Sequence, residues 1–163
     1  PSYPVLSPLY KPCEGQKGEV LEHKLIILGR LPGLNEYTTA NRTNPHVGRR
    51  MKKDSEDTII WQIRHQMRGV HINCPVLIYY RFYEPNKRRD NDNILSGAVK
   101  FIQDSLVKTG ILKDDNQPCI PKFYFDTFVD KVNPRIEVEI TELTQKQATL
   151  TLVELLNDLG RVK

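Results

Sequence analysis

Residues 76–110 read VLIYYRFYEPNKRRDNDNILSGAVKFIQDSLVKTG and contain the strongest strand and the clearest helix of the chain. β-Branched and aromatic residues fill Val76–Tyr83, with a proline on either side, which is typical of a strand. Apolar residues then recur at helical spacing over Asn93–Thr109, and Gly110 is a suitable helix stop. The stretch therefore predicts a strand, a polar loop and an amphipathic helix.

Further strands and helices are predicted on either side of this stretch. The apolar run His23–Arg30 indicates a buried strand, the polar segment Leu34–Gly48 a loop, and the spacing in Arg49–Gly69 a helix. Lys122–Val129 and Arg135–Leu143 alternate as strands do, and the second should have one solvent-exposed face. The expected order β-α-β-α-β-β predicts an α+β fold, a mixed β-sheet with two main helices.

Three segments are expected along the 163 residues, which are enough for one domain with a core. Residues 1–22 are rich in proline and lack periodicity, so they are predicted to be an N-terminal extension. Residues 23–143 hold the predicted sheet and main helices and form the domain. Residues 144–163 show apolar spacing of the helical type and are predicted to be a C-terminal helical tail.

Composition narrows the class of protein. The net charge of +4 favours an anionic partner without requiring one. The three cysteines form no C-x-x-C pair, so neither a disulfide framework nor a zinc site is indicated, and a reducing, cytoplasmic setting is expected. No apolar run approaches the roughly 20 residues that span a bilayer, and the first residues do not resemble a signal peptide. We therefore expect no membrane partner.

Acidic and basic residues cluster around the predicted helix. The cationic run Lys87–Arg89 precedes Asp90 and Asp92, and a second acidic pair, Asp114 and Asp115, follows the helix. Carboxylate oxygens suit a hard cation such as Mg²⁺, and neighbouring cations suit a phosphate backbone. The combination predicts a metal-dependent enzyme that acts on nucleic acid.

A purely structural interpretation of these residues stays open. In it Asp92 caps the helix, Asp90 pairs with Arg88 or Arg89, and residues 114–116 form a surface turn. We expect Asp92 to be the N-cap in either case, and both carboxylates to point toward the strand edge. The co-occurrence of two acidic clusters around one helix, beside cations, favours a functional site. The spacing does not say whether the second pair returns beside the first.

These residues resemble the signature of the RusA-type Holliday junction resolvases. The family pattern is R/K-x-D-x-D-N, a helix, and then a hydrophobic residue, one further residue and D-D-x-Q. Residues 88–93 and 110–117 match this pattern, and Leu31–Tyr37 is similar to the loop after the family's first strand. The resemblance implies a RusA-like nuclease domain over residues 23–143. It also implies a Mg²⁺-dependent endodeoxyribonuclease, with Mn²⁺ as an alternative ion, that resolves four-way junctions by paired nicks in recombination and repair.

The resemblance also assigns residues to the metal and to catalysis. The family's metal-binding aspartates fall on Asp90, Asp92 and Asp115, and Asp114 is the adjacent carboxylate. Asn93 matches the family's asparagine after the second aspartate. The bound metal would polarise the scissile phosphate and lower the pKa of the attacking water.

One departure concerns the catalytic cation. The family usually has a lysine four residues after the second aspartate, where this chain has Ser96. Lys100 lies one turn further on the same line of the helix, and Lys113 lies near the second acidic pair. Arg89 is a further possible substitute for the missing lysine, and Lys100 and Lys113 are the candidates to stabilise the charge that develops on the phosphate.

DNA contacts are expected from a loop and from scattered cations. Gly33, Leu34, Asn35 and Glu36 match a DNA-contacting loop of the family, although a cation would suit DNA better than Glu36. The helix predicted over Arg49–Gly69 has basic residues in its first turns, where positive charge opposes the helix dipole. A phosphate contact is one explanation for these basic residues, and a solvated surface is another. The residues expected to contact the phosphate backbone of the DNA are Arg42, Arg49, Arg50, Lys52, Lys53, Lys87, Arg88 and Arg89.

Family members are homodimers, so two sites would face one branched DNA, one for each strand to be cut. Three other functions stay open. The first is a less selective Mg²⁺ nuclease that cuts flaps or other branches. The second is a junction-binding protein with weakened catalysis, suggested by Ser96. The third is a structural or protein-interaction domain whose charged residues are merely solvated.

Overall fold

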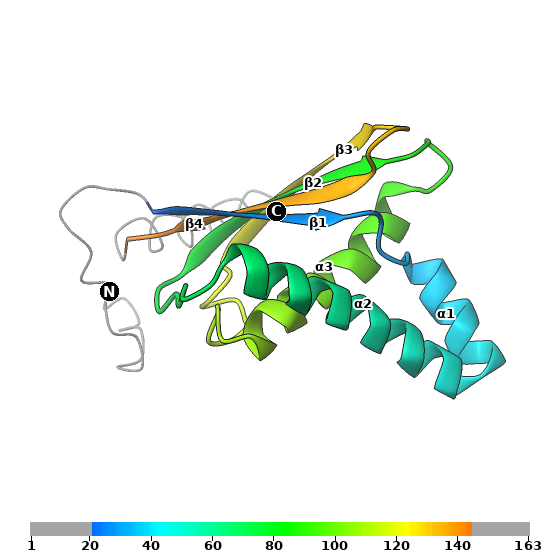
Figure 1. The fold of residues 1–163 in the computed structure, drawn as a ribbon, viewed down its shortest axis with the longest axis horizontal. Helices are drawn as coiled ribbons and strands as arrows, with labels where there is room; N and C mark the ends of the chain where they lie inside the picture. Colours follow the sequence, from blue (N-terminus) through cyan, green and yellow to red (C-terminus); the bar gives the residue numbers. More distant parts are fainter. Residues whose placement is uncertain (1–20, 145–163) are drawn as a thin grey trace, which may run out of the picture.

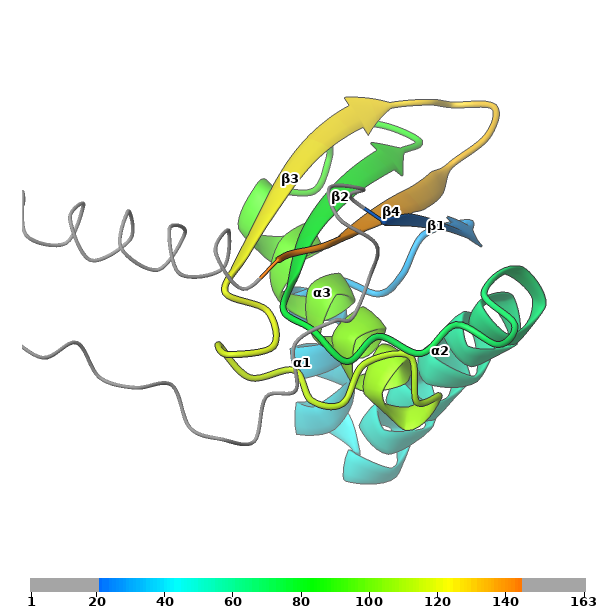
Figure 2. The same cartoon turned by 90° about the vertical axis from the view of Figure 1, so that its left-hand side faces the viewer.

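The computed structural model describes residues 21–144, in which a four-stranded mixed sheet is covered on one face by helices (Figure 1 and Figure 2). The strand order is β1-β4-β2-β3; β2 and β3 are parallel, and the other two pairs are antiparallel. This confirms the predicted α+β class. The elements are β1 (Glu22–Leu28), α1 (Leu34–Thr43), α2 (Pro45–Gln66), β2 (Val76–Glu84), α3 (Asn91–Lys108), β3 (Lys122–Val129) and β4 (Arg135–Glu142).

The prediction of a loop over Leu34–Gly48 is wrong, because this segment contains the short helix α1 and the start of α2. The sequence of α1, LNEYTTANRT, is polar and has several residues of low helix propensity, so its periodicity is weak. Packing against the rest of the protein compensates for this low helix propensity. Ala40 is buried, and the ring of Tyr37 packs edge-on against that of Phe101, with 5.7 Å between the ring centroids. Asn44 then caps α2 by accepting a hydrogen bond from the backbone N–H of His46 at 2.9 Å.

The core lies between the inner face of the sheet and the helices. Strand β2 alternates throughout between buried and half-buried positions, and β4 does so up to its last residue, as predicted for β4, so one side of each strand faces the helices. On the opposite face Arg81 pairs with Glu139 at 2.9 Å. The fully buried residues include Ile78, Tyr80 and Phe82 of β2, Val138 and Ile140 of β4, Ile59 of α2, and Ile102 and Leu106 of α3.

The segment that joins β1 to α1 lies unusually close to α3. A Cβ atom added to Gly97 would be 2.7 Å from the carbonyl oxygen of Pro32, and one added to Gly33 would be 2.5 Å from Oδ1 of Asn93. The same approach allows Oδ1 of Asn93 to accept the backbone N–H of Asn35 at 2.8 Å. The starts of α1 and α3 are therefore held together, which fixes the loop before α3.

Replacing Gly97 with alanine is expected to destabilise the protein by about 1–3 kcal/mol, because the new methyl group meets backbone atoms. The direction of the change in unfolding free energy is informative, because alanine normally stabilises a helix by about 1 kcal/mol relative to glycine. The free energy of unfolding in urea measures the effect. Ser96→Ala is the matched control at the exposed neighbouring position. Equal stability of the two variants would contradict the close approach.

The predicted N-terminal extension (1–22) and C-terminal helical tail (144–163) lie almost entirely outside the described residues, and both stay predictions. Within residues 21–144, none of the helices combines the length and the apolar character that crossing a bilayer requires.

Candidate active site

The two aspartates before the helix lie at the N-terminus of α3, but their local roles differ from the prediction. Asp90, rather than Asp92, is the N-cap residue, and Asp92 lies in the first turn. The side chain of Asp90 makes no capping hydrogen bond. Within residues 21–144, neither carboxylate has a hydrogen-bonding or ion-pair partner. Two carboxylates with no side-chain partner among the described residues therefore mark this helix start.

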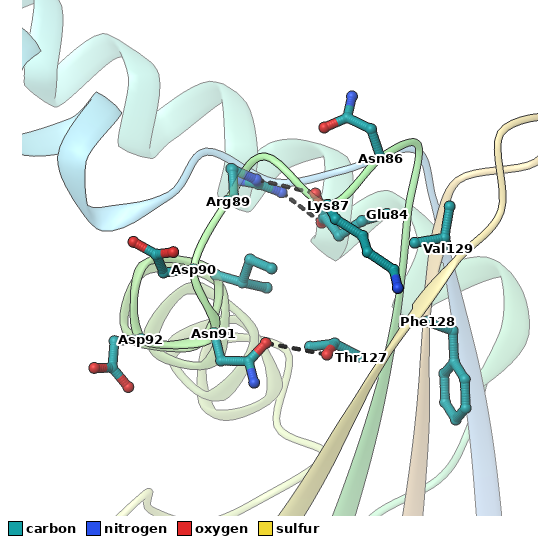
Figure 3. A pocket seen from close by; sticks show the side chains of 11 residues that line it. Glu84, Asn86, Lys87, Arg89, Asp90, Asn91, Asp92, Thr127, Phe128 and Val129 are labelled. Atoms are coloured by element: carbon teal, nitrogen blue, oxygen red, sulfur yellow. Dashed lines mark hydrogen bonds and ion pairs between the residues drawn. The ribbon is translucent and has the colours of Figure 1, made fainter.

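Both aspartates point to the same side of the helix start, away from β3 (Figure 3). The expectation that they face the strand edge is wrong, because Asn91 takes that direction and its Oδ1 accepts the hydroxyl of Thr127 at 3.0 Å. A hollow of about 670 Å³ lies at this end of the molecule. It is lined by Glu84, Asn86, Lys87, Arg89, Asp90, Asn91, Asp92, Ile94, Thr127, Phe128 and Val129.

A buried ion pair holds the loop that ends in Asp90. Arg89 donates from Nε to Glu84 at 3.0 Å, and its terminal nitrogen donates to the other oxygen of the same carboxylate. Its remaining nitrogen donates to the backbone carbonyl of Leu31 at 2.9 Å. The side chains of Arg89 and Glu84 are only 10% and 8% exposed. Arg89, expected to contact DNA, thus ties the end of β2 to the segment before α1.

The second acidic pair returns beside the middle of α3. The chain turns at Gly110, which has the left-handed φ of 74° that favours glycine. Asp115 then reaches Lys100, with 2.9 Å between the carboxylate and the ammonium group. Asp114 instead structures its own turn, since its carboxylate accepts the backbone N–H of Asp115 at 2.8 Å and the side-chain amide of Asn116 at 2.6 Å.

Lys100 belongs to a network of ion pairs that links α3 to α2. Its ammonium group also pairs with Asp104 at 2.8 Å, and Lys52 of α2 pairs with the same carboxylate at 3.1 Å. Hydrogen bonds to Asp104 and Asp115 raise the pKa of Lys100. Partial burial raises the pKa of Asp104, but the two ammonium groups outweigh it and the net pKa is lowered. Sequence reasoning missed Asp104, although its i,i+4 spacing from Lys100 was a signal.

The donor chemistry at the start of α3 fits a hard divalent cation. Asp90 and Asp92 offer uncompensated carboxylate oxygens, which are the ligands that Mg²⁺ prefers. A complete set of ligands is not assembled, since the part of the chain that the structure describes contains no cluster of three or more His, Cys, Asp or Glu side chains arranged for a metal. The third expected ligand, Asp115, is paired with Lys100.

A comparison with known protein families settles the class of the protein. The family model described as Endodeoxyribonuclease RusA matches residues 34–141, more than half of the 163 residues. The chain belongs to the RusA endodeoxyribonuclease family. The match runs from α1 almost to the end of β4 and includes both acidic clusters, so the family and the enzyme class expected from the sequence are confirmed. A search of curated proteins gave no match.

In this RusA-family chain, the four residues expected to form a DNA-contacting loop are a helix start. Gly33 is the N-cap of α1, and residues 34–36 form its first turn. The carboxylate of Glu36 accepts the backbone N–H of Gly33 at 2.8 Å and pairs with Arg30 at 2.9 Å. An acidic residue at this position is thus explained by capping.

The cations expected to contact DNA divide into those that form ion pairs within the protein and those that are exposed to solvent. Lys52, like Arg89, is engaged in ion pairs, and Arg50 approaches Asp54 at 3.9 Å while remaining well exposed. The candidate catalytic Lys113 lies exposed in the loop beside the second acidic pair. The other exposed cations of the expected set are Arg42, Arg49, Lys53, Lys87 and Arg88.

Proposed function

We propose that this RusA-family protein is a Mg²⁺-dependent endonuclease that resolves four-way DNA junctions by paired nicks in recombination and repair. Mn²⁺ is proposed as an alternative ion. The observation that carries the proposal is that Asp90 and Asp92, at the start of α3 and within the region that matches the family, have no ion-pair partner within residues 21–144. Carboxylates that lack a cationic partner are the ones that a bound divalent cation stabilises most.

In this proposal the chain's own residues divide the work. Asp90 and Asp92 hold the metal and Asp115 completes the set, with Asp114 beside it. When bound, the metal supplies Lewis acidity at the phosphate and lowers the pKa of a water. Lys100 and Lys113 are the candidates to stabilise the negative charge that develops on the phosphate oxygens.

DNA binding is assigned to exposed cations near this helix start and along α2. Lys87 and Arg88 lie in the loop directly before Asp90, and Arg49, Arg50 and Lys53 are exposed in the first turns of α2. Contacts of this kind go to phosphates and give salt-dependent binding with little sequence content. A homodimer would present two such sites to one junction, which paired nicks require. A reducing, cytoplasmic setting is part of the proposal and agrees with the buried thiol groups of Cys74 and Cys119.

A labelled synthetic four-way junction, a linear duplex and a flap test the proposal, each incubated with Mg²⁺ and with EDTA. Symmetric nicks in the junction alone, abolished by EDTA, are the expected result. Equal cutting of all three substrates would replace it with the less selective nuclease. Failure to bind the junction in Ca²⁺ would leave a structural or protein-interaction domain. Sedimentation velocity at the assay concentration tests the homodimer separately.

A second candidate function, a junction-binding protein with weakened catalysis, is favoured by one observation. The exposed Ser96 stands where the family has its lysine, and the next lysine on that line, Lys100, is held by two carboxylates. Tight junction binding in Mg²⁺ without nicks would support this candidate over the leading one.

A further inference from the structure

The ammonium group of Lys100 lies between carboxylates that come from two parts of the chain. Asp104 is one turn further along α3 and pairs with it at 2.8 Å, and Asp115 approaches from the loop after α3 at 2.9 Å. Lys52 of α2 holds Asp104 from its other side at 3.1 Å. One cation thus serves two carboxylates, and only one of these is an expected metal ligand.

The three aspartates assigned to the metal differ in their surroundings. Within residues 21–144, Asp90 and Asp92 have no cationic partner, whereas Asp115 has Lys100. The side chains of Lys100 and Asp115 are 58% and 29% exposed, so this pair is accessible from solvent. Because exposed ion pairs contribute little to stability, the contact is weak enough for a divalent cation to replace it.

We infer that Lys100 is an internal counter-ion of Asp115 that a divalent cation displaces, and that Asp104 is the carboxylate that keeps the displaced ammonium group paired. This inference rests on the assignment of Asp115 to the metal site in the proposed function. It accounts for the two-sided position of Lys100, since the ammonium group loses Asp115 and retains Asp104. It also makes Asp104 a positioning residue, for which neither the sequence nor the family match provides a role.

The inference predicts opposite effects for two substitutions. Lys100→Met removes the competitor for Asp115 and is expected to tighten Mn²⁺ binding by about two- to fivefold, the range that an exposed ion pair can supply. Asp104→Asn leaves the ammonium group with Asp115 alone and is expected to weaken Mn²⁺ binding by a similar factor. Isothermal titration of each protein with Mn²⁺ in the absence of DNA measures both effects.

The double variant Lys100→Met with Asp104→Asn distinguishes two ways in which Asp104 could affect Mn²⁺ affinity, namely by holding the displaced Lys100 or by its own negative charge. If Asp104 acts through Lys100, Asp104→Asn has no effect on Mn²⁺ affinity once Lys100 is methionine. If Asp104 acts as a negative charge alone, it weakens binding equally in both backgrounds, which would overturn the inference. Lys113→Met is the control for a lost positive charge in the loop of Asp115 and should change the affinity less than Lys100→Met does.

Folding of the variants is checked by thermal unfolding, and Lys52 keeps Asp104 paired when Lys100 is replaced. Lys100→Gln is the second variant, and tighter Mn²⁺ binding is expected for it too. Unchanged or weaker binding by both Lys100 variants, while Asp90→Asn and Asp92→Asn lose the ion, would overturn the inference and leave the proposed function standing. The absence of Mn²⁺ binding in every protein would overturn both.

Discussion

Replacing Asp90 or Asp92 with asparagine is expected to lower junction cleavage by more than about 100-fold, since even the outer partners of metal ligands contribute about 10- to 100-fold. Asparagine keeps the size of the side chain and removes the charge that attracts a divalent cation. Junction binding in Ca²⁺ should change little, because the phosphate contacts are assigned to other residues. Single-turnover cleavage of a labelled junction, with a parallel gel-shift assay, measures the two effects.

Asp57→Asn is the matched control, because Asp57 is an exposed aspartate of α2 that is far from α3 in the sequence and assigned to no site. It should retain full cleavage. The metal-free Asp90 and Asp92 variants should stay within about 1 kcal/mol of the unmodified protein in urea, because losing a negative charge relieves repulsion but also removes a favourable interaction with the N-terminus of α3. Full cleavage by either variant would show that the assignment of these aspartates is wrong.

Much of the fold could be predicted from local patterns. Strands β2 and β4 alternate between buried and half-buried positions, and α3 has a continuous apolar stripe. The sequence pattern of each segment therefore predicts both its secondary structure and its buried face. The helix α1 could not be found in this way, because what holds it is tertiary. Its start depends on the hydrogen bond between Asn35 and Asn93, and its body on the contact between Tyr37 and Phe101.

The same division applies to the candidate site. Asp90 and Asp92 are two residues apart, so their proximity follows from the sequence alone. The return of Asp115 to the middle of α3 depends on the turn at Gly110 and on the pair with Lys100, neither of which the spacing determines. The capping role of Glu36 was also hidden, because the helix that it caps was not predicted.

Arg89 shows how a charged run conceals a buried residue. Three cations in a row, Lys87–Arg89, are indistinguishable by composition, and all were assigned to DNA. The period-two pattern of β2 held a signal, because Glu84 has the same parity as the buried Ile78 and Phe82 and therefore points inward. A carboxylate on the buried face of a strand requires a cationic partner, and the nearest arginine that can fold back is Arg89.

Arg89→Met is therefore expected to destabilise the protein by about 3–5 kcal/mol, because it leaves the carboxylate of Glu84 buried without a partner. It also leaves the carbonyl of Leu31 without its donor. Urea unfolding measures the loss. Arg88→Met is the matched control one residue earlier, where the side chain is exposed, and should stay within about 0.5 kcal/mol of the unmodified protein.

The double variant Arg89→Met with Glu84→Leu distinguishes a structural pair from a DNA contact. Because well-packed apolar residues often replace a buried ion pair without loss, the second substitution should restore much of the stability that the first removes. Junction binding by the double variant should then keep the salt dependence of the unmodified protein, whereas Arg88→Met should reduce the salt slope. A shallower salt slope for the double variant, with Arg89→Met fully stable, would return Arg89 to the DNA-binding surface.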